Sequence, residues 1–502
     1  MGYLLSSTIE SPDEISVIAP EGQLTWRRLE DNARRVARAL AATGVGVGGR
    51  WAILSRNRLE WPELYLGNVL AGARYVPVNW HLTSGEIEYY LRNSGSTLLV
   101  VDPSLEDIGR QAAHKAGLPG NRVIVLGPDY EQWRDLHEPA EPEQSVAGAP
   151  LIYTGGTTGP SKGVTRADVG QPVSRWVTGQ ATWGGFIGMP DAGRSFLATP
   201  LYHAFGAGLL GASMTRRHTM VIRDRFDPID FLDAIARESI TSVPLVPTLM
   251  VRLAKLPDAE FTRRDLSMLE WIVHTAAPCP PWAKALLIER LGPIITEFYG
   301  SSEGTGPVVC TSEQWLERPG TVGRPAPNLA VSVVDDDGQD LQPGQLGTLY
   351  FKRHDGPPEY HGAPDKTAAS RLADGRFTVG DLGYVDDEGY VFLVDRRIDL
   401  IISGGVNIYP AEIEGVLSEH PAVRDVAVFG IPHPEFGQDI KAAVECETGT
   451  SPTEGELIEW CRERLASFKV PQSIDFHPSL PREAHGKLKK RLLRDAYWPD
   501  AT

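Results

Sequence analysis

Cysteine is scarce in this chain of 502 residues: the four cysteines are Cys279, Cys310, Cys446 and Cys461. They form no CxxC pair and have no common metal-ligand spacing, so the sequence predicts neither a disulfide framework nor a structural zinc site. So few cysteines in a chain of this length are typical of a reducing compartment. We therefore expect a cytoplasmic protein.

Long apolar runs are also missing. The most apolar stretch, residues 204–214, is interspersed with glycines, whereas a membrane-spanning helix needs about 20 apolar residues. The first residues show no basic segment followed by an apolar one, which a secretory signal would have. We expect no stable membrane anchor.

Positive charge is in deficit. The chain has 49 Lys and Arg against 65 Asp and Glu, which gives a formal net charge of −16. Nucleic acids and anionic membranes bind proteins through clustered lysines and arginines, so the composition predicts no nucleic-acid partner. A small polyanionic ligand would have to be met by a few well-placed cationic groups.

The chain does contain an alternation of short apolar runs with amphipathic segments. Helical spacing covers residues 24–40, 84–91 and 105–116, and strand-like runs cover residues 51–54, 75–78, 98–101 and 122–126. This alternation predicts an α/β fold with largely parallel sheets. At roughly 150 residues per domain, the length predicts two or three folding units.

The pattern changes in the last third of the chain. From about residue 331, short strands and turns predict antiparallel structure, including a hairpin over residues 383–392. Beyond residue 396 the pattern is compact α+β, with helices expected at 410–419 and 454–465 and strands at 425–429 and 474–476. We therefore predict a large N-terminal α/β multilayer domain (1–395, with a β-rich subdomain at 331–395) and a small mobile α+β C-terminal domain (396–502).

Residues 44–49 satisfy the GxGxxG pattern of dinucleotide-binding loops. That pattern binds a pyrophosphate when a strand enters the turn and a helix leaves it, because the helix N-terminus then faces the anion. Here a helical segment precedes the glycines and a strand follows them. We therefore interpret this loop as the end of a helix and not as a nucleotide site.

A second glycine-rich loop, residues 153–163, reads Tyr-Thr-Gly-Gly-Thr-Thr-Gly-Pro-Ser-Lys-Gly and follows an apolar strand. Glycines let backbone N–H groups approach an anion, threonine hydroxyls add donors, and Lys162 adds a positive charge. It is not the P-loop GxxxxGK[ST], because Ser161 precedes the lysine and Gly163 follows it. A polyphosphate-binding loop is predicted, with a flexible surface loop as the alternative.

Five further segments accompany this loop in the chain. Together with the loop they resemble the motifs of the adenylate-forming superfamily, and within it the chain is most similar to acyl-CoA synthetases. The resemblance covers nearly the whole chain, from about residue 24 onward. The segments are Tyr299-Gly300-Ser301-Ser302-Glu303-Gly304, Thr378-Val379-Gly380-Asp381, Asp395-Arg396, the run from Gly404 to Glu414, and the run from Leu480 to Lys487.

The resemblance implies two successive displacements: a carboxylate attacks the α-phosphate of ATP to give acyl-AMP and pyrophosphate, and the CoA thiol then displaces AMP. ATP, CoA and a small carboxylic acid are the implied substrates, and Mg²⁺ is the implied cofactor. Thr158 and Glu303 are the implied Mg²⁺ ligands, since this ion prefers oxygen ligands. The residues implied to cradle the phosphates are Thr154, Gly155, Gly156, Thr157, Thr158, Gly159 and Lys162.

The same resemblance implies which residues bind the nucleoside part of ATP. Asp381 suits the two ribose hydroxyls because a carboxylate only accepts hydrogen bonds; from local sequence alone, a turn residue is the alternative. Arg396 is expected near the ribose and phosphate, and Tyr299 is expected to stack on adenine. The remaining implied residues of the nucleotide site are Ala276, Ala277, Pro278, Phe298, Gly300, Ser301 and Ser302.

Lys487 matches the lysine that reaches the carboxylate and the α-phosphate during adenylation, although local sequence alone favours a solvated basic tail. The resemblance also implies a rotation of the C-terminal domain, after which Gly404 and Gly405 replace Lys487 and help form a pantetheine channel. At the expected pivot, where the family usually has Asp or Lys, this chain has Ile398. Gly155, in place of the family's usual serine, is a second departure.

His203 is placed by the resemblance at the gate of the acyl pocket, where it orients the carboxylate; a core histidine is the alternative. The small and apolar residues of the site predict a fatty, aromatic or steroid-type acid. Other activities stay open: loading of a carrier-protein phosphopantetheine, nucleotide binding by an inactive regulator, and luciferase-type oxidation. Retention of Glu303, Asp381 and Lys487 argues against the regulator. The sequence does not determine the oligomeric state, and a homodimer is one option.

Overall fold

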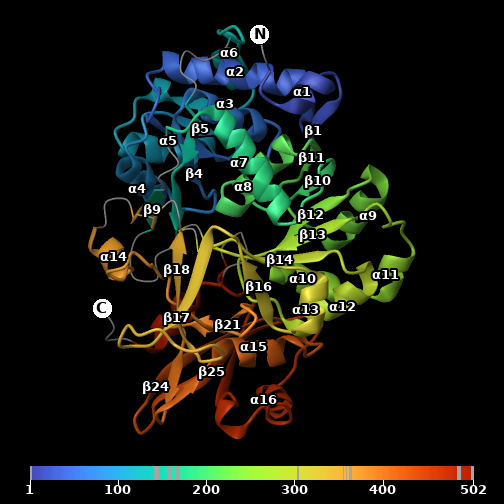
Figure 1. The fold of residues 1–502 in the computed structure, drawn as a ribbon, viewed down its shortest axis with the longest axis vertical. Helices are drawn as coiled ribbons and strands as arrows, with labels where there is room; N and C mark the ends of the chain where they lie inside the picture. Colours follow the sequence, from blue (N-terminus) through green and yellow to red (C-terminus); the bar gives the residue numbers. More distant parts are fainter. Residues whose placement is uncertain are drawn as a thin grey trace. The chain divides into compact units, whose positions relative to one another are not determined.

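The computed structural model divides the chain into two compact units (Figure 1). Unit 1 comprises Met1–Pro244, Ala259–Val273 and Pro358–Ala369, and unit 2 comprises Leu245–Asp258, His274–Pro357 and Ser370–Thr502. Each unit is therefore assembled from segments that are far apart in the sequence. The structure describes residues 3–140, 146–154, 161–165, 170–301, 303, 305–353, 356–357, 359–360, 364–482 and 488–498.

The first sheet of unit 1 is parallel, with the strand order β6-β5-β3-β4-β7. Side chains alternate between the two faces of the sheet along β3. On one face, the Trp51 indole N–H donates to Asn68 Oδ1 of α3 at 2.8 Å. On the other face, Leu54 packs against α4 and α5. The bounds are β3 Arg50–Leu54, β4 Arg74–Val78, β5 Leu99–Val101, β6 Val123–Val125, β7 Ala149–Pro150, α3 Trp61–Ala71, α4 Ser84–Ser94, α5 Glu106–Lys115 and α6 Pro128–Asp135.

Helix α2 (Trp26–Ala42) begins where Thr25 accepts a hydrogen bond from the Arg28 N–H at 3.2 Å. Its apolar face, which includes Leu29 and Leu40, is fully buried. The helix ends at Ala42 and β3 begins at Arg50, which confirms that the GxGxxG segment follows a helix and precedes a strand. The predicted helices and strands up to residue 126 are confirmed to within a few residues.

The second sheet of unit 1 has the order β12-β10-β11-β1-β2, with parallel pairing except between β1 and β2. Its helices α7 and α8 pack closely, because Gly208 leaves room for the Trp183 ring: a Cβ at this glycine would lie 3.2 Å from it. The bounds are β1 Ile15–Ala19, β2 Gly22–Thr25, β10 Gly193–Leu197, β11 His218–Ile222, β12 Ser242–Leu245, α7 Val173–Phe186, α8 Ala204–Thr215 and α9 Pro228–Glu238.

Unit 2 contains an antiparallel run of strands with the order β14-β15-β16-β21-β20-β18-β17. Its core includes Phe351, Phe377 and Val391. Antiparallel structure was predicted from residue 331 and is confirmed there, and it also extends back to β14. The bounds are β14 Ile295–Tyr299, β15 Val308–Cys310, β16 Thr321–Pro325, β17 Leu329–Val334, β18 Gly347–Arg353, β20 Asp381–Val385 and β21 Val391–Arg396.

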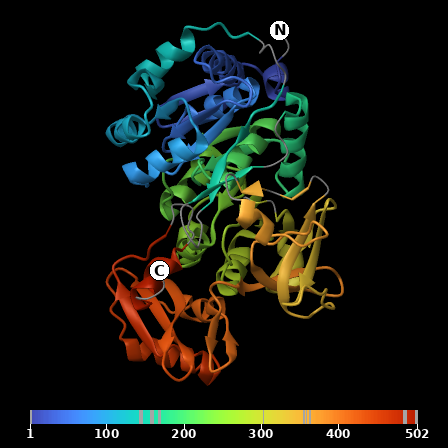
Figure 2. The ribbon, with the colours of Figure 1, turned by 90° about the vertical axis from the view of Figure 1, so that its left-hand side faces the viewer.

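The C-terminal part of unit 2, from β22 onward, gathers around a second sheet, drawn in orange to red in Figure 2. Val426 and Val428 of β24 pack with α15 and α16 on one face, and Ala427 and Phe429 pack with Leu493 of α17 on the other. The predicted helices and strands are present, whereas β25 was not predicted. The bounds are β22 Ile401–Ser403, β23 Val406–Ile408, α15 Pro410–Ser418, β24 Val423–His433, β25 Gly437–Cys446, α16 Glu454–Arg462, β26 Ser473–His477 and α17 Lys490–Arg494.

In the described part of the chain, no helix has both the length and the apolar character that crossing a bilayer demands. The four cysteines are free thiols, as expected from their spacing. The described residues also contain no group of three or more His, Cys, Asp or Glu side chains arranged to hold a metal ion.

Candidate active site

The two ends of the predicted phosphate loop lie opposite each other in unit 1. Strands β8 (Ile152–Thr154) and β9 (Lys162–Thr165) are antiparallel, with Thr154 paired with Lys162. Two tyrosines of α4 and β8 anchor this hairpin: Tyr153 donates to Asn93 Oδ1 at 2.7 Å, and Tyr89 donates to the Ser161 carbonyl at 3.0 Å. The other predicted loop residues, Gly155, Gly156, Thr157, Thr158 and Gly159, lie outside the described residues.

In unit 2, three predicted residues from three separate motifs meet. The Tyr299 hydroxyl donates to Asp381 Oδ2 at 2.7 Å, and Arg396 Nε lies 3.4 Å from Asp381 Oδ1. Asp381 and Arg396 are paired residues on the neighbouring strands β20 and β21. Asp381 is only 7 % exposed, so its charge is balanced within the protein by the Arg396 guanidinium, while the Tyr299 hydroxyl donates a hydrogen bond to it.

The backbone around Asp381 is shaped by Gly380, which has a left-handed φ of 83°. Its N–H is bonded to Thr378 Oγ1 at 3.0 Å, and its carbonyl accepts from the Arg397 N–H at 2.9 Å. Only glycine adopts this conformation without strain. The turn thereby fixes Asp381 at the start of β20.

Charge around Arg396 is unusually negative. Burial alone would lower the pKa of Arg396, but the carboxylates of Asp381, Asp399 and Glu303 together raise the pKa above its ordinary value. Burial and the neighbouring Asp381 likewise raise the pKa of Tyr299, so its hydroxyl keeps the proton that it donates. Tyr299, Glu303, Asp381 and Arg396 therefore form one electrostatic cluster, which we call the nucleoside cluster.

The predicted base-lining residues also belong to unit 2. Ala276 has a left-handed φ of 82°, which is rare for a residue with a side chain and marks a tight turn after β13 (Trp271–His274). Gly300 lies so close to Phe298 that a Cβ would come within 2.9 Å of its ring. Ala277, Pro278 and Ser301 are described, and Ser302 lies outside the described residues.

A buried ionic group on the strand that carries Tyr299 was not predicted from the sequence. Glu297 precedes Tyr299 by two residues on β14 and accepts from Lys284 Nζ at 2.7 Å, while His274 Nε2 lies 3.7 Å from the same carboxylate oxygen. Burial lowers the pKa of His274 to about 4, so the imidazole is neutral at neutral pH. A charged residue on an otherwise buried strand was the signal that could have revealed this ionic group.

His203 belongs to unit 1, where it immediately precedes α8. Its backbone N–H donates to the Pro200 carbonyl at 3.2 Å, and its ring packs against Tyr202 with ring centroids 4.4 Å apart. The helix that follows is apolar on all sides and mostly buried. The role of His203 at an acyl pocket stays a prediction.

Gly404 and Gly405 form the two-residue turn between β22 and β23, with φ values of 56° and 80°. Two consecutive positive φ angles are what the tightest hairpin turns require, and glycine supplies them without strain. The flanking Ile402 and Val406 are about half exposed. Ile398, at the expected pivot, lies in the turn formed by residues 397–399 and is 40 % exposed.

Lys487 lies outside the described residues, but the residues on either side of its segment are described. Arg482 and Leu488 form an isolated antiparallel bridge, and the Lys489 N–H donates to the Pro481 carbonyl at 2.8 Å. The described residues on the two sides of positions 483–487 therefore lie next to each other.

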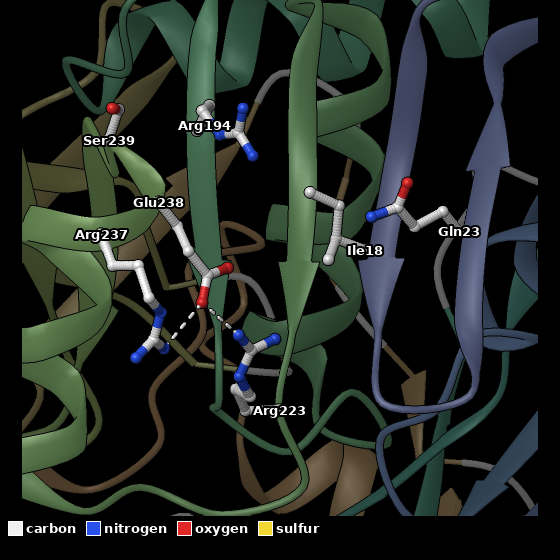
Figure 3. Close-up of a pocket in the computed structure, with 7 residues that line it drawn as sticks. All are labelled: Ile18, Gln23, Arg194, Arg223, Arg237, Glu238 and Ser239. Carbon is white, nitrogen blue, oxygen red and sulfur yellow. Dashed lines mark hydrogen bonds and ion pairs between the residues drawn. The ribbon is translucent and has the colours of Figure 1, made fainter.

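Figure 3 shows a separate cavity of about 360 Å³ in unit 1. Three arginines line this cavity, and two of them are ion-paired with Glu238: Arg223 at 2.5 Å and Arg237 at 3.1 Å. No residue predicted for the nucleotide, the metal or the acid lines this cavity. Its lining residues are Ile18, Gln23, Arg194, Arg223, Arg237, Glu238 and Ser239.

Two family models match the chain. The model described as "AMP-binding enzyme" matches residues 7–360, and the one described as "AMP-binding enzyme C-terminal domain" matches residues 412–487. The chain belongs to the AMP-binding enzyme family. This confirms the predicted adenylate-forming superfamily and, with it, ATP-dependent activation of an acid.

Curated relatives of this AMP-binding enzyme act with different acceptors. It is 31 % identical to the fatty acid–[acyl-carrier-protein] ligase ScoC of Streptomyces coeruleorubidus, over 98 % of this chain and 95 % of the relative. It is 32 % identical to a feruloyl-CoA synthase of an Amycolatopsis species, over 96 % of each chain. The names of these relatives therefore do not agree on an acid or on an acceptor.

Among solved structures, ATP-bound MatB from Rhodopseudomonas palustris is similar with a TM-score of 0.85 and 30 % identity, covering 97 % of this chain and 96 % of MatB. This match confirms the predicted fold class, an α/β protein with a large N-terminal and a small C-terminal domain. It also supports the binding of ATP by this AMP-binding enzyme.

Proposed function

We propose that this chain is an ATP-dependent carboxylic acid–CoA ligase that acts on a hydrophobic acid of the fatty, aromatic or steroid type. The observation that carries the proposal is the nucleoside cluster, in which Asp381 is buried yet held by donors from Tyr299 and Arg396. Asp381 Oδ2 uses one lone pair for the Tyr299 hydroxyl, and the carboxylate keeps further lone pairs for the ribose hydroxyls. The cluster can therefore bind a vicinal diol, such as that of a ribose, next to a phosphate group.

In the first step, a carboxylate oxygen of the acid attacks the α-phosphorus of ATP, and the bond to the pyrophosphate oxygen breaks. The protein contributes mainly position and charge to such a step. Arg396 is permanently cationic and is the cross-strand partner of Asp381, the proposed ribose-binding residue, so we propose that it faces phosphate oxygens. Lys162 and Lys487 are proposed to add the remaining positive charge.

Magnesium fits the cluster through one carboxylate. Mg²⁺ in nucleotide sites is commonly held by one or two carboxylates and by the phosphates themselves, and Glu303 can supply a carboxylate beside Arg396. When bound, the ion neutralises charge on the phosphate oxygens. Thr158, the second proposed ligand, lies outside the described residues.

In the second step, the CoA sulfur attacks the acyl carbon, the thiol proton is lost, and AMP leaves. We propose that residues 396–502 form the domain that rotates about the turn at 397–399 between the two steps, and that Gly404 and Gly405 then approach the pantetheine arm. Two observations support this: the separate family match that begins at residue 412, and the exposed tight turn at the two glycines.

Acid-dependent exchange of pyrophosphate into ATP tests the adenylation step, with panels of fatty, aromatic and steroid-type acids and Mg·ATP. The account predicts exchange with at least one apolar acid and none with amino acids. Exchange with amino acids only would contradict the proposed substrate class.

A second candidate acceptor is the phosphopantetheine of a carrier protein, because ScoC is named as an acyl-carrier-protein ligase. Both acceptors present the same thiol arm, so only a competition distinguishes them. Acyl-AMP formed on the enzyme is offered CoA or a phosphopantetheinylated carrier protein at equal concentration. Faster consumption with CoA supports the ligase, and consumption with the carrier protein alone supports the alternative.

A further inference from the structure

The cavity of Figure 3, which we call the arginine cavity, has an excess of positive charge. Its lining includes Arg194, Arg223 and Arg237, and Glu238 is the one acidic residue among its seven lining residues. Arg223 and Arg237 are both paired with this single carboxylate. The cavity therefore keeps a surplus of two positive charges in a chain whose formal net charge is −16. Such a local surplus attracts an anion.

Arg194 carries an unused hydrogen-bond donor at this place. Its Nε–H is buried and, among the residues that the structure describes, has no hydrogen-bond acceptor. Buried donors without an acceptor are rare in native proteins, and one that faces a cavity is suited to an acceptor on a ligand. The backbone of Arg194 is fixed on β10, because its N–H donates to Thr241 Oγ1 at 3.0 Å and its carbonyl accepts the Thr241 N–H at 3.0 Å.

The other lining residues are uncharged and come from neighbouring elements of unit 1. Ile18 of β1 adds an apolar side chain, Gln23 of β2 adds an amide, and Ser239 adds a hydroxyl at the end of α9. In the view of Figure 3, Arg194 and Gln23 lie on opposite sides of Ile18. The volume of about 360 Å³ is within the range of pockets that hold small organic molecules, so there is room for more than a bare ion.

The charge surplus indicates which anion fits best. Arginine binds phosphate and carboxylate oxygens through paired N–H groups. A phosphate monoester carries a charge of about −1.5 to −2 at pH 7, whereas a carboxylate carries only one negative charge. The surplus of two therefore matches the phosphate monoester better. The carbonyls at the end of α9 disfavour an anion, but Arg237 lies in the last turn of that helix and offsets them.

We propose that the arginine cavity binds a small phosphate monoester, with its phosphate group on Arg194 and Arg223 and its organic part against Ile18 and Gln23. This site is additional to the proposed function, since no residue assigned to ATP, the acid or CoA lines the cavity. Either a soluble metabolite or a lipid headgroup presents such a phosphate group, and the experiment separates these two sources.

The test is calorimetric titration of the full-length protein with glycerol 3-phosphate. Wild type is expected to show saturable binding, and Arg194→Met is expected to weaken it about 10- to 100-fold, as loss of a hydrogen bond between charged groups does. Glu238→Gln enlarges the charge surplus and is expected to strengthen binding about two- to fivefold, the scale of a partly exposed ion pair. A purely structural role of these residues predicts no such gain.

Arg225→Met is the matched control. It removes the same charge two residues from Arg223, but the Arg225 side chain is 86 % exposed and does not line the cavity. We expect this variant to bind glycerol 3-phosphate as wild type does. Equal weakening in Arg194→Met and Arg225→Met would reduce the effect to net charge and overturn the proposal. Binding that Mg·ATP displaces and that Arg194→Met leaves unchanged would place the probe in the nucleotide site and also overturn it.

Cosedimentation with phosphatidylcholine vesicles that contain phosphatidic acid distinguishes the source of the phosphate group. Binding of glycerol 3-phosphate that depends on Arg194, without vesicle binding, supports the site and assigns it to a soluble metabolite. Vesicle binding that depends on Arg194 supports the site and assigns it to a lipid headgroup. Absence of Arg194-dependent binding in both experiments overturns the proposal.

A folding defect in Arg194→Met would leave Glu238→Gln to decide, because its expected effect has the opposite sign. Tighter binding of glycerol 3-phosphate by Glu238→Gln supports the proposal. Unchanged or weaker binding by this variant overturns it.

Discussion

Replacing Asp381 by asparagine keeps the size of the side chain and removes its charge. Both carboxylate oxygens already face donors, from Tyr299 at 2.7 Å and from Arg396 at 3.4 Å. The amide group of the asparagine would therefore meet one of these donors. The change also leaves Arg396 without its paired carboxylate on β20.

The size of the effect follows from the hydrogen bonds to the ribose. A hydrogen bond to a charged group contributes about 1.5–3 kcal/mol and one between neutral groups about 0.5–1.5 kcal/mol. Each of two ribose hydroxyls then loses about 1–1.5 kcal/mol on Asp381→Asn, so the total is about 2–3 kcal/mol. This corresponds to a loss of about 30- to 150-fold in kcat/KM for ATP.

The assay is acid-dependent pyrophosphate exchange at varied ATP concentration. Asp387→Asn is the matched control, because Asp387 is exposed in the turn that joins β20 to β21. We expect the control to match wild type. A loss below about threefold for Asp381→Asn, or a loss confined to the KM of the acid, would refute the assignment of Asp381 to the ribose, since the worked loss is at least tenfold larger.

Three further predictions concern stability. Lys284→Met leaves Glu297 buried beside a neutral His274 and is expected to lower the free energy of unfolding by about 3–5 kcal/mol, measured by urea denaturation. Gly405→Ala places a side chain at φ 80° and is expected to cost about 1–2 kcal/mol in the same assay. Burial lowers the pKa of His218 from 6.5 to about 4, so the unfolded chain binds the extra proton between these values. The contribution of His218 to the free energy of unfolding is then fully present above about pH 6.5 and is lost, by about 3 kcal/mol, as the pH falls toward 4. The variant His218→Gln is expected to lose less stability over this pH range.

Each of these three stability predictions would be contradicted by a specific result. A double variant Lys284→Met, Glu297→Gln that is no more stable than the single variant would show that an uncompensated charge is not the cause. Gly405→Ala with an unchanged urea midpoint would show that the turn relaxes. A pH profile of stability that is the same in His218→Gln and wild type would assign the acid sensitivity to other groups.

Much of the fold could be predicted from the sequence because local apolar patterns indicate its helices and strands. Short apolar runs identified β3 to β6, and the helical spacing of apolar residues over 24–40 identified α2. Strand β25 was missed because Gln438, Asp439 and Glu445 interrupt its apolar run, while its buried middle residues lie between β24 and β26, which come from other parts of the chain. Local sequence carries no record of such partners.

In the candidate site, too, single residues could be predicted from the sequence, whereas their contacts could not. Tyr299, Asp381 and Arg396 were identified from separate motifs, but the direct bond between Tyr299 and Asp381 depends on the pairing of distant strands. The ion pair of Glu297 with Lys284 and that of Lys490 with Glu414 were not predicted. In each case a charged residue is buried, and a sequence does not show which charges the fold will bring together.

The central claim is that this chain joins an acid to AMP and then to CoA. The most direct measurement is mass spectrometry of the products formed by the wild-type enzyme from Mg·ATP and the best acid of the exchange panel, first without and then with CoA. The account predicts acyl-AMP and pyrophosphate without CoA, and thioester and AMP after CoA is added. Formation of ADP and phosphate, or acyl-AMP that persists when CoA is present, would contradict it.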